Sequence, residues 1–170
     1  MDWLECKNKK IAKEVSLDFP LIESLKKPSQ DKLQSESLLP LSPITISSKI
    51  SLAYDSLREL LEALALKNGF KIYNHECYTA FLKEIIKNSS LGDNFDEIRV
   101  LRNNVNYYGK QITEEECKTA LANMQIIRGK IQNYLDGEEE DLLTFFIALT
   151  LRGYRLVWFR LAGLGPKSKT

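Results

Sequence analysis

The side chains able to transfer protons, act as thiolates or hold metal ions are few and widely spaced. His75 is the only histidine among the 170 residues, and an imidazole with an ordinary pKa of ~6.5 can take and return a proton near neutral pH. The cysteines have no paired spacing that chelates zinc or defines a disulfide framework. We therefore expect reduced core thiols at Cys6, Cys77 and Cys117. The run Glu138 to Asp141 distributes four carboxylates around a helix start, so the sequence predicts neither a metal site nor a cofactor.

The end of the chain combines basic and aromatic residues, with no acidic residue after Asp141. Such a segment can contact phosphate and stack on bases, or lie on an anionic membrane. Its apolar residues can also form one broad helix face. We favour the interpretation that this face packs against the core of the domain or against a second protomer. A membrane span is excluded, because three arginines fall inside the stretch and each costs ~2.5 to 3.5 kcal/mol at the bilayer centre. The residues concerned are Arg152, Arg155, Arg160, Lys167 and Lys169, with Tyr154, Trp158 and Phe159 between them.

Length and charge limit the class of protein. A chain of 170 residues fits one ordinary domain. Charged residues make up 28% of it and cancel to a net charge of +1, so no overall field indicates nucleic-acid or membrane binding, and any basic site must be local. The N-terminus becomes charged again before an apolar run of signal-peptide length develops, which predicts a cytoplasmic protein.

Apolar residues recur at three- and four-residue steps and strong strand signals are absent, which predicts an all-α fold. Short connections between the later helices indicate antiparallel neighbours, so we expect an up-and-down bundle of four to five helices. Four helices have clear start or stop signals. They are 49–67, ended by Asn68-Gly69; a helix from Asn74; one opened by Asn94 and Glu97; and one opened by Thr113 and Glu116.

The two ends of the chain are less regular than this core. Residues 1 to about 27 have a helical pattern with an expected interruption at Phe19-Pro20. Residues 28–48 hold three prolines and many serines, which predicts an extended connection across the surface. We therefore divide the chain into an N-terminal helical region with its connection (1–48), a helical core (49–136), and a C-terminal helix with a basic tail (137–170), packed on the same domain or at a dimer interface.

Two stretches of the chain point to a known family. The first is Tyr54 to Ala63 (YDSLRELLEA), continuing to Gly69-Phe70-Lys71 and Asn74-His75-Glu76-Cys77, and the second is Leu101 to Gly109 (LRNNVNYYG). Together they resemble archaeal and bacterial domains of the HEPN superfamily, over roughly residues 47 to 135. The resemblance implies a helical bundle, commonly a homodimer, with an arginine-polar motif near the dimer interface. For many members it also implies metal-independent ribonuclease activity, and some members work as toxins beside a small nucleotidyltransferase antitoxin.

The ribonuclease motif of this family begins with an arginine, which is usually followed by asparagine, aspartate or histidine. It ends in a histidine a few residues later. Arg102 and Asn103 match its start, whereas the positions open to the final histidine hold Tyr107, Tyr108 and Gly109. A phenol with a pKa near ~10 is protonated at pH 7 and makes a poor general base, although it can donate a hydrogen bond. The resemblance implies ligand-binding roles for Arg102, Asn103 and Asn106, and, in an active enzyme, catalytic roles for Arg102, Tyr107 and Tyr108.

His75 and Arg102 each have two interpretations. His75 begins a different helix, and it replaces the missing base only where the bundle or a partner protomer brings it beside Arg102; otherwise it caps or covers the helix start. Arg102 can instead pair with Glu59, Glu62 or another carboxylate of the bundle. Positions 102 and 107 point about 140° apart in a regular helix, so one site would include both only across a helix break or a dimer interface.

Two functions follow from the resemblance and the missing histidine. The first is a catalytically degenerate HEPN-like binding or regulatory module, which dimerises and engages RNA, a nucleotide or a partner protein. The second is a divergent metal-independent ribonuclease or toxin, in which Arg102 stabilises the phosphorane charge and Tyr107 or Tyr108 replaces the histidine as donor. We favour the first, because the second lacks a general base.

Overall fold

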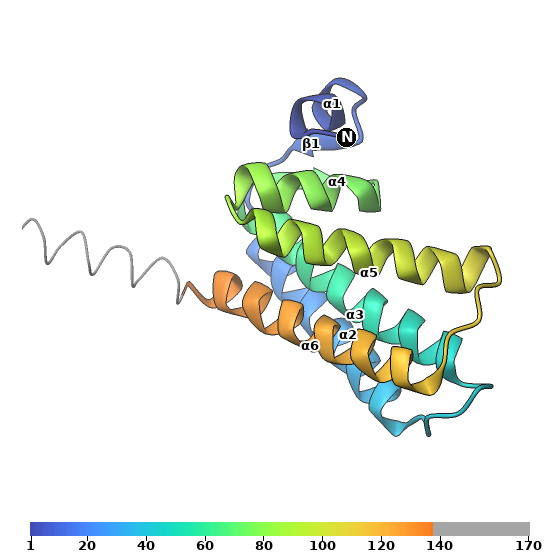
Figure 1. Cartoon of the computed structure of the whole chain (residues 1–170). Helices are drawn as coiled ribbons and strands as arrows, with labels where there is room; N and C mark the ends of the chain where they lie inside the picture. The colour runs from blue at the N-terminus through green and yellow to red at the C-terminus, as the bar shows by residue number, and fades with distance from the viewer. Residues whose placement is uncertain (138–170) are drawn as a thin grey trace, which may run out of the picture. The chain divides into compact units, whose positions relative to one another are not determined.

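The computed structural model describes residues 1–137. Over this range the chain forms six α-helices, one π-helical segment and two short strands, and the predicted all-α fold is confirmed (Figure 1). Residues Met1–Leu135 make one compact unit, while the expected last helix and the basic tail lie outside the described residues. The elements are α1 (Trp3–Asn8), β1 (Ala12–Glu14), α2 (Phe19–Leu38), α3 (Ile46–Lys67), β2 (Phe70–Ile72), α4 (His75–Ala80), η1 (Phe81–Ile85), α5 (Ser89–Tyr107) and α6 (Glu114–Asp136).

Helix α3 is the centre of the core, because fourteen of its 22 residues are buried. A surface helix buries one stripe, so burial on this scale means that neighbours cover several of its faces. Helices α2 and α5 pack against α3 (Figure 1), and α6 adds a buried stripe of its own. The largest fully buried side chains include Tyr54, Leu57, Leu61, Tyr78 and Phe95.

Several helix ends lie where the sequence signals predict them. Gly69 follows α3 with a φ of +79°, a left-handed conformation that favours glycine. Asn74 caps α4 by accepting the Glu76 N–H at 2.8 Å. Thr113 and Glu116 form the capping box of α6, in which the Glu116 carboxylate accepts the Thr113 N–H at 2.7 Å. These predictions are confirmed because a cap depends on residues next to one another in the chain.

The start of α5 differs from its prediction. Asn88, rather than Asn94, is the N-cap and accepts the Leu91 N–H at 3.0 Å. Gly92 precedes the predicted start at Asn94, but it belongs to α5 and marks a close approach to η1. A Cβ at this position would lie 2.5 Å from the Cγ of Lys83. The glycine therefore serves helix packing, a role that a local sequence signal does not distinguish from a turn.

The N-terminal segment forms a short helix and a strand in place of the longer helical region that the sequence predicts. Strand β1 pairs antiparallel with β2, which places Lys13 directly opposite Lys71. The predicted interruption at Phe19-Pro20 is confirmed, because α2 begins at Phe19 with Pro20 in its first turn. The first fourteen residues thus belong to a small ribbon that lies beside α4 (Figure 1).

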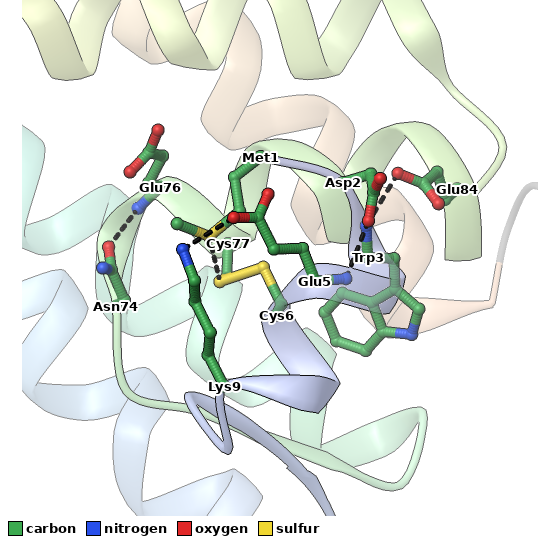
Figure 2. Close-up of a disulfide and its surroundings, with 10 residues drawn as sticks. All are labelled: Met1, Asp2, Trp3, Glu5, Cys6, Lys9, Asn74, Glu76, Cys77 and Glu84. Atoms are coloured by element: carbon green, nitrogen blue, oxygen red, sulfur yellow. Dashed lines mark hydrogen bonds and ion pairs between the residues drawn. A yellow bond between two sulfur atoms is a disulfide. The ribbon is translucent and has the colours of Figure 1, made fainter.

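A disulfide joins Cys6 of α1 to Cys77 of α4, so the prediction of reduced thiols is wrong for this pair (Figure 2). The two cysteines are 71 residues apart in the sequence, and no spacing rule predicts a bond over that length. The pairing of β1 with β2 is what brings them together. Cys117 is a free and buried thiol, as predicted.

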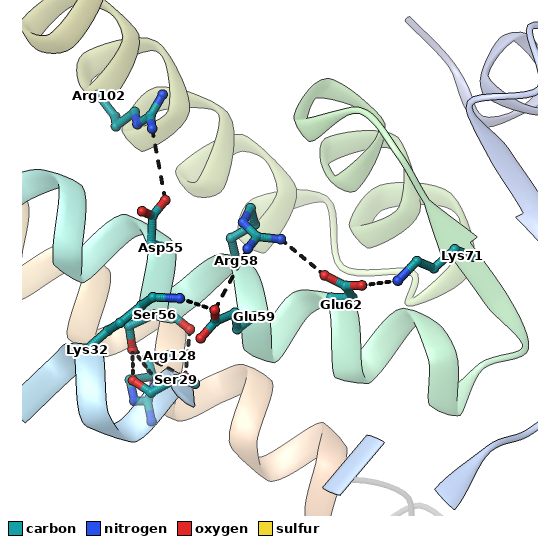
Figure 3. A network of polar contacts seen from close by, with 10 residues as sticks. All are labelled: Ser29, Lys32, Asp55, Ser56, Arg58, Glu59, Glu62, Lys71, Arg102 and Arg128. Carbon is teal, nitrogen blue, oxygen red and sulfur yellow. Dashed lines mark hydrogen bonds and ion pairs between the residues drawn. The ribbon is translucent and has the colours of Figure 1, made fainter. Parts of the chain in front are cut away.

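Helix α2 replaces most of the connection that was predicted for residues 28–48. It continues as one helix through Pro28, although an interior proline costs ~3 kcal/mol or more. Tertiary contacts offset that cost: Ser29 and Ser56 are fully buried, and each hydroxyl donates to the other residue's carbonyl at 2.7 Å. Arg128 of α6 donates to both hydroxyls, which joins three helices at one point (Figure 3).

Candidate functional site

Helix α5 places Arg102 against α3. The Arg102 guanidinium carbon lies 5.3 Å from the centre of the Tyr54 ring, and Nη2 lies 4.0 Å from Oδ1 of Asp55. The side chain is 14% exposed. The expected alternative partners, Glu59 and Glu62, bind other cations of α2, α3 and β2 instead. Arg102 therefore has a carboxylate neighbour, but at a distance too long for a direct hydrogen bond (Figure 3).

Arg102 also contacts Tyr107 on the same helix. Nη1 of Arg102 donates to the Tyr107 hydroxyl at 2.7 Å, and the guanidinium carbon lies 5.1 Å from the centre of the ring. The expectation that one site includes both positions only across a helix break or a dimer interface is wrong, because both lie on α5. Side chains on a helix lean toward its N-terminus, so the tyrosine at the end of α5 lies back over the preceding turn, where a long arginine reaches it. Tyr107 remains 68% exposed.

His75 lies beside the same tyrosine that Arg102 covers. Its Nδ1 is 3.1 Å from the hydroxyl of Tyr54, whose side chain is fully buried. Burial raises the pKa of Tyr54 well above its usual range, so the phenol keeps its proton and can donate it to Nδ1. The cap of α4 is Asn74. The fold thus brings His75 and Arg102 into contact with the same phenol.

Burial, followed by the surrounding positive charge, favours the neutral imidazole of His75. Burial lowers the pKa of His75 below its ordinary value, and the positive charges of Arg58 and Arg102, and to a smaller extent Arg99, lower it further, while Asp55 opposes them. The neutral ring carries one proton, and the contact with Tyr54 fits both tautomers. Where the phenol donates to Nδ1 the proton is on Nε2, and where the phenol accepts from Nδ1 the Nε2 lone pair is free.

Three arginines, one of them Arg102, lie near His75 and Tyr54, and they differ in how closely they contact a carboxylate. Arg58 donates to Glu62 at 3.1 Å, and Arg99 donates to Asp96 at 2.9 Å. Arg102 has the loosest carboxylate contact, and its buried Nε has no hydrogen-bond partner. An unpaired buried donor costs ~1 to 3 kcal/mol. Arg102 is therefore the least completely paired arginine of the three. We call the group of Tyr54, Asp55, His75, Arg102 and Tyr107 the Arg102 site.

The other predicted site residues lie outside this group. Asn106 is held between two serines of α3: its Nδ2 donates to Ser51 at 2.7 Å, and its Oδ1 accepts from Ser47 at 2.9 Å. Both ends of its amide thus join α3 to α5. Tyr108 is the C-cap residue of α5 and is 80% exposed. Asn103 is half-buried beside Arg102 in the sequence. The basic and aromatic segment from Arg152 onward lies outside the described residues.

Sequence reasoning did not assign Tyr54 or Asp55 to the site, although Tyr54 and the nearby Arg58 form one short pattern. Residues four apart on a helix lie on the same face, so Tyr54 and Arg58 point toward the same neighbour. That spacing was the available signal. The spacing does not tell which helix faces these two residues, because that depends on how α5 packs against α3.

Comparison with models of known protein families and with curated proteins finds no match for this chain. Within residues 1–137, no cluster of histidine, cysteine, aspartate and glutamate side chains has the makings of a metal site. In the same range, no helix combines the length and the apolar character needed to cross a bilayer.

Proposed function

We propose that this chain is a HEPN-like module that binds RNA at the Arg102 site without cleaving it. The observation that carries the proposal is the position of the Arg102 guanidinium beside the rings of Tyr54 and Tyr107, with a carboxylate neighbour that is too far away for a direct hydrogen bond. A planar guanidinium recognises phosphate through parallel hydrogen bonds. The exposed ring of Tyr107 offers a surface for an unpaired base.

Binding is favoured over cleavage because Tyr107 stands where the resemblance expects the catalytic histidine. A general base needs a free nitrogen lone pair within reach of the proton it removes. His75 has a free lone pair at Nε2 only in the tautomer whose Nδ1 donates to Tyr54; in the other tautomer Nε2 is protonated and donates a hydrogen bond. The protonated Nε2 suits a binding module whose nuclease chemistry is lost, because it can donate to a phosphate or a base.

A divergent ribonuclease is the second candidate, and one observation favours it. The only histidine and the motif arginine contact the same phenol, and the tyrosine at the motif position touches the arginine. If the protons shift so that Tyr54 accepts from Nδ1, the Nε2 lone pair becomes free to act as a base. The resemblance then implies a toxin that works beside a nucleotidyltransferase antitoxin, and in either case it implies a homodimer.

Binding and cleavage are separated in one experiment. Labelled single-stranded RNA is titrated with the protein in EDTA, anisotropy gives Kd, and the same samples are then run on a denaturing gel. We expect binding with the RNA intact. Intact RNA that does not bind would reject the proposal, and products with cyclic-phosphate ends that disappear in Arg102→Ala would establish the ribonuclease instead.

A further inference from the structure

We infer that the β1–β2 ribbon carries a second RNA-contacting surface, which extends the Arg102 site along a single strand. The inference rests on the proposed function, since it extends the same footprint. We call Lys10, Lys13 and Tyr73 the ribbon patch. Its members are exposed side chains at the end of α1, on β1 and directly after β2.

The first observation is an excess of unpaired positive charge. Four lysines fall within residues 7–13. Lys7 and Lys9 have carboxylate partners, at 4.0 Å and 2.6 Å, whereas Lys10 and Lys13 have no ion pair among the described residues. Exposed cations without partners contribute little to folding and remain free for phosphate.

The second observation is that both free lysines occupy positions that stability alone does not favour. Lys10 has a φ of 58°, in the left-handed region where glycine or asparagine is usual. Lys13 lies directly opposite Lys71 in the strand pair, and like charges in that relation repel. These are two independent departures from local preference within four residues. They indicate that the lysines contribute to binding a partner and not to the stability of the ribbon.

The third observation is an aromatic ring next to this charge. Nζ of Lys13 lies 5.3 Å from the centre of the Tyr73 ring, and Tyr73 is 59% exposed. Proteins bind single strands by combining cations for the phosphates with aromatic rings on which bases stack. Lys13 and Tyr73 supply one of each within a single contact.

The ribbon patch is connected to the Arg102 site in two ways. Along the chain, Tyr73 is separated from His75 by one residue. In space, Lys71 binds Glu62, which also accepts from Arg58 at 3.1 Å. Figure 3 shows these side chains in a row that leads from Arg102 along α3 to Lys71 on β2. The opposing strand then carries Lys13, so the path passes through the ion pairs of Asp55 and Glu62 and ends at a cation that is unpaired among the described residues.

Fixed contacts hold the ribbon in this position. The disulfide from Cys6 to Cys77 joins α1, which precedes β1, to α4, and the Trp3 N–H of α1 donates to Glu84 at 2.9 Å (Figure 2). The Trp3 ring packs edge-on against Phe70 of β2, with centroids 5.1 Å apart. A platform held at three points loses little conformational freedom when it binds.

An anionic membrane is the alternative partner for exposed lysines, and Leu4 of α1 is 63% exposed. The observations favour RNA for two reasons. Tyr73 is separated by one residue from His75 of the Arg102 site, and its ring lies under a lysine rather than in an apolar patch. Binding to an anionic membrane is therefore the alternative result that the experiment below must distinguish from RNA binding.

The test compares salt dependence between matched variants of the full chain. Each phosphate contact on a single strand contributes about 0.7 to the slope of log Kd against log salt. Lys10→Gln/Lys13→Gln should lower that slope by about 1.4, and Tyr73→Ala should weaken binding about tenfold at fixed salt. Lys27→Gln/Lys118→Gln removes the same charge from exposed positions of α2 and α6 and should leave both quantities unchanged.

The outcomes distinguish this inference from the proposed function. If wild type binds RNA through Arg102 but both ribbon variants retain its slope and Kd, the second surface is rejected and the function stands. If the ribbon variants weaken binding while Arg102→Ala does not, the Arg102 site is rejected and the ribbon surface stands. Absence of RNA binding rejects both. Lysine-dependent binding to phosphatidylserine vesicles, with RNA binding unaffected by the ribbon variants, assigns the patch to a membrane.

Discussion

Arg102 donates a hydrogen bond to Tyr107 across 2.7 Å, although the two residues are five positions apart on one helix. The contact holds the guanidinium beside two aromatic rings and leaves Tyr107 largely exposed. It assembles the motif arginine and the tyrosine at the motif's histidine position within one protomer. A dimer is therefore not needed to bring these two side chains together.

The first prediction concerns the exposed ring of Tyr107. Tyr107→Phe removes the hydrogen bond to Arg102 but keeps the ring, and should weaken RNA binding two- to tenfold, as expected for ~0.5 to 1.5 kcal/mol. Tyr107→Ala also removes the stacking surface and should weaken it further. Tyr108→Ala is the matched control, because Tyr108 is the neighbouring tyrosine and is 80% exposed. Equal losses in Tyr107→Ala and Tyr108→Ala would remove the specific role of Tyr107.

Arg102 is predicted to be a ligand-binding residue more than a structural one. Its carboxylate neighbour Asp55 is 35% exposed, so Arg102→Ala strands no buried charge, and the variant should lose about 1–2 kcal/mol of unfolding free energy. Denaturant unfolding measures this. A loss of ~3 to 5 kcal/mol, typical of a broken buried pair, would instead make Arg102 an anchor of the bundle.

His75 predicts a specific pH dependence of stability. Its pKa in the folded protein lies below the unfolded value of ~6.5, because of burial and then the positive charge of Arg58 and Arg102. Between these two pKa values the unfolded chain binds more protons than the folded one, so stability is full above pH ~6.5 and falls as the pH drops toward the folded pKa, with a slope of at most ~1.4 kcal/mol per pH unit.

The matched variant for this pH dependence is His75→Gln, which removes the only histidine. Melting curves of both proteins should converge as the pH falls below 6.5, since only wild type loses this contribution. An identical pH profile in the two proteins would show that the folded imidazole titrates as it does in the unfolded chain.

The disulfide gives a prediction about reductant. Because it closes a loop over a sequence separation of 71, opening it should lower the free energy of unfolding by roughly 2–4 kcal/mol. Denaturant unfolding with and without dithiothreitol measures the loss, and Cys6→Ser/Cys77→Ser should match the reduced protein. Cys117→Ser should still respond to reductant, because Cys117 forms no disulfide. A wild-type midpoint unchanged by dithiothreitol would contradict the bond.

The sequence predicts features that depend on neighbouring residues and misses those that depend on distant ones. The helix end at Gly69 and the capping box from Thr113 to Glu116 are local, and they are confirmed. The continuation of α2 through Pro28 and the disulfide depend on partners 27 and 71 residues away, and both were missed.

The candidate site shows the same division. Arg102 and Tyr107 were identified from a motif, whereas the position of His75 beside Tyr54 requires α3 and α4 to meet. The expected angle between positions 102 and 107 failed for a different reason, because it describes backbone directions and ignores the length of the two side chains.

The most direct test of the central claim is the affinity of the folded protein for single-stranded RNA with and without the Arg102 guanidinium. Anisotropy titrations in EDTA compare wild type, Arg102→Lys and Arg102→Ala, each corrected for its folded fraction. We predict that Arg102→Ala binds at least tenfold more weakly, as loss of a charge-assisted hydrogen bond of ~1.5 to 3 kcal/mol requires, and that Arg102→Lys is intermediate because it keeps the charge but loses the planar donor pair. Equal Kd values for wild type and Arg102→Ala would contradict the proposal that this site binds RNA.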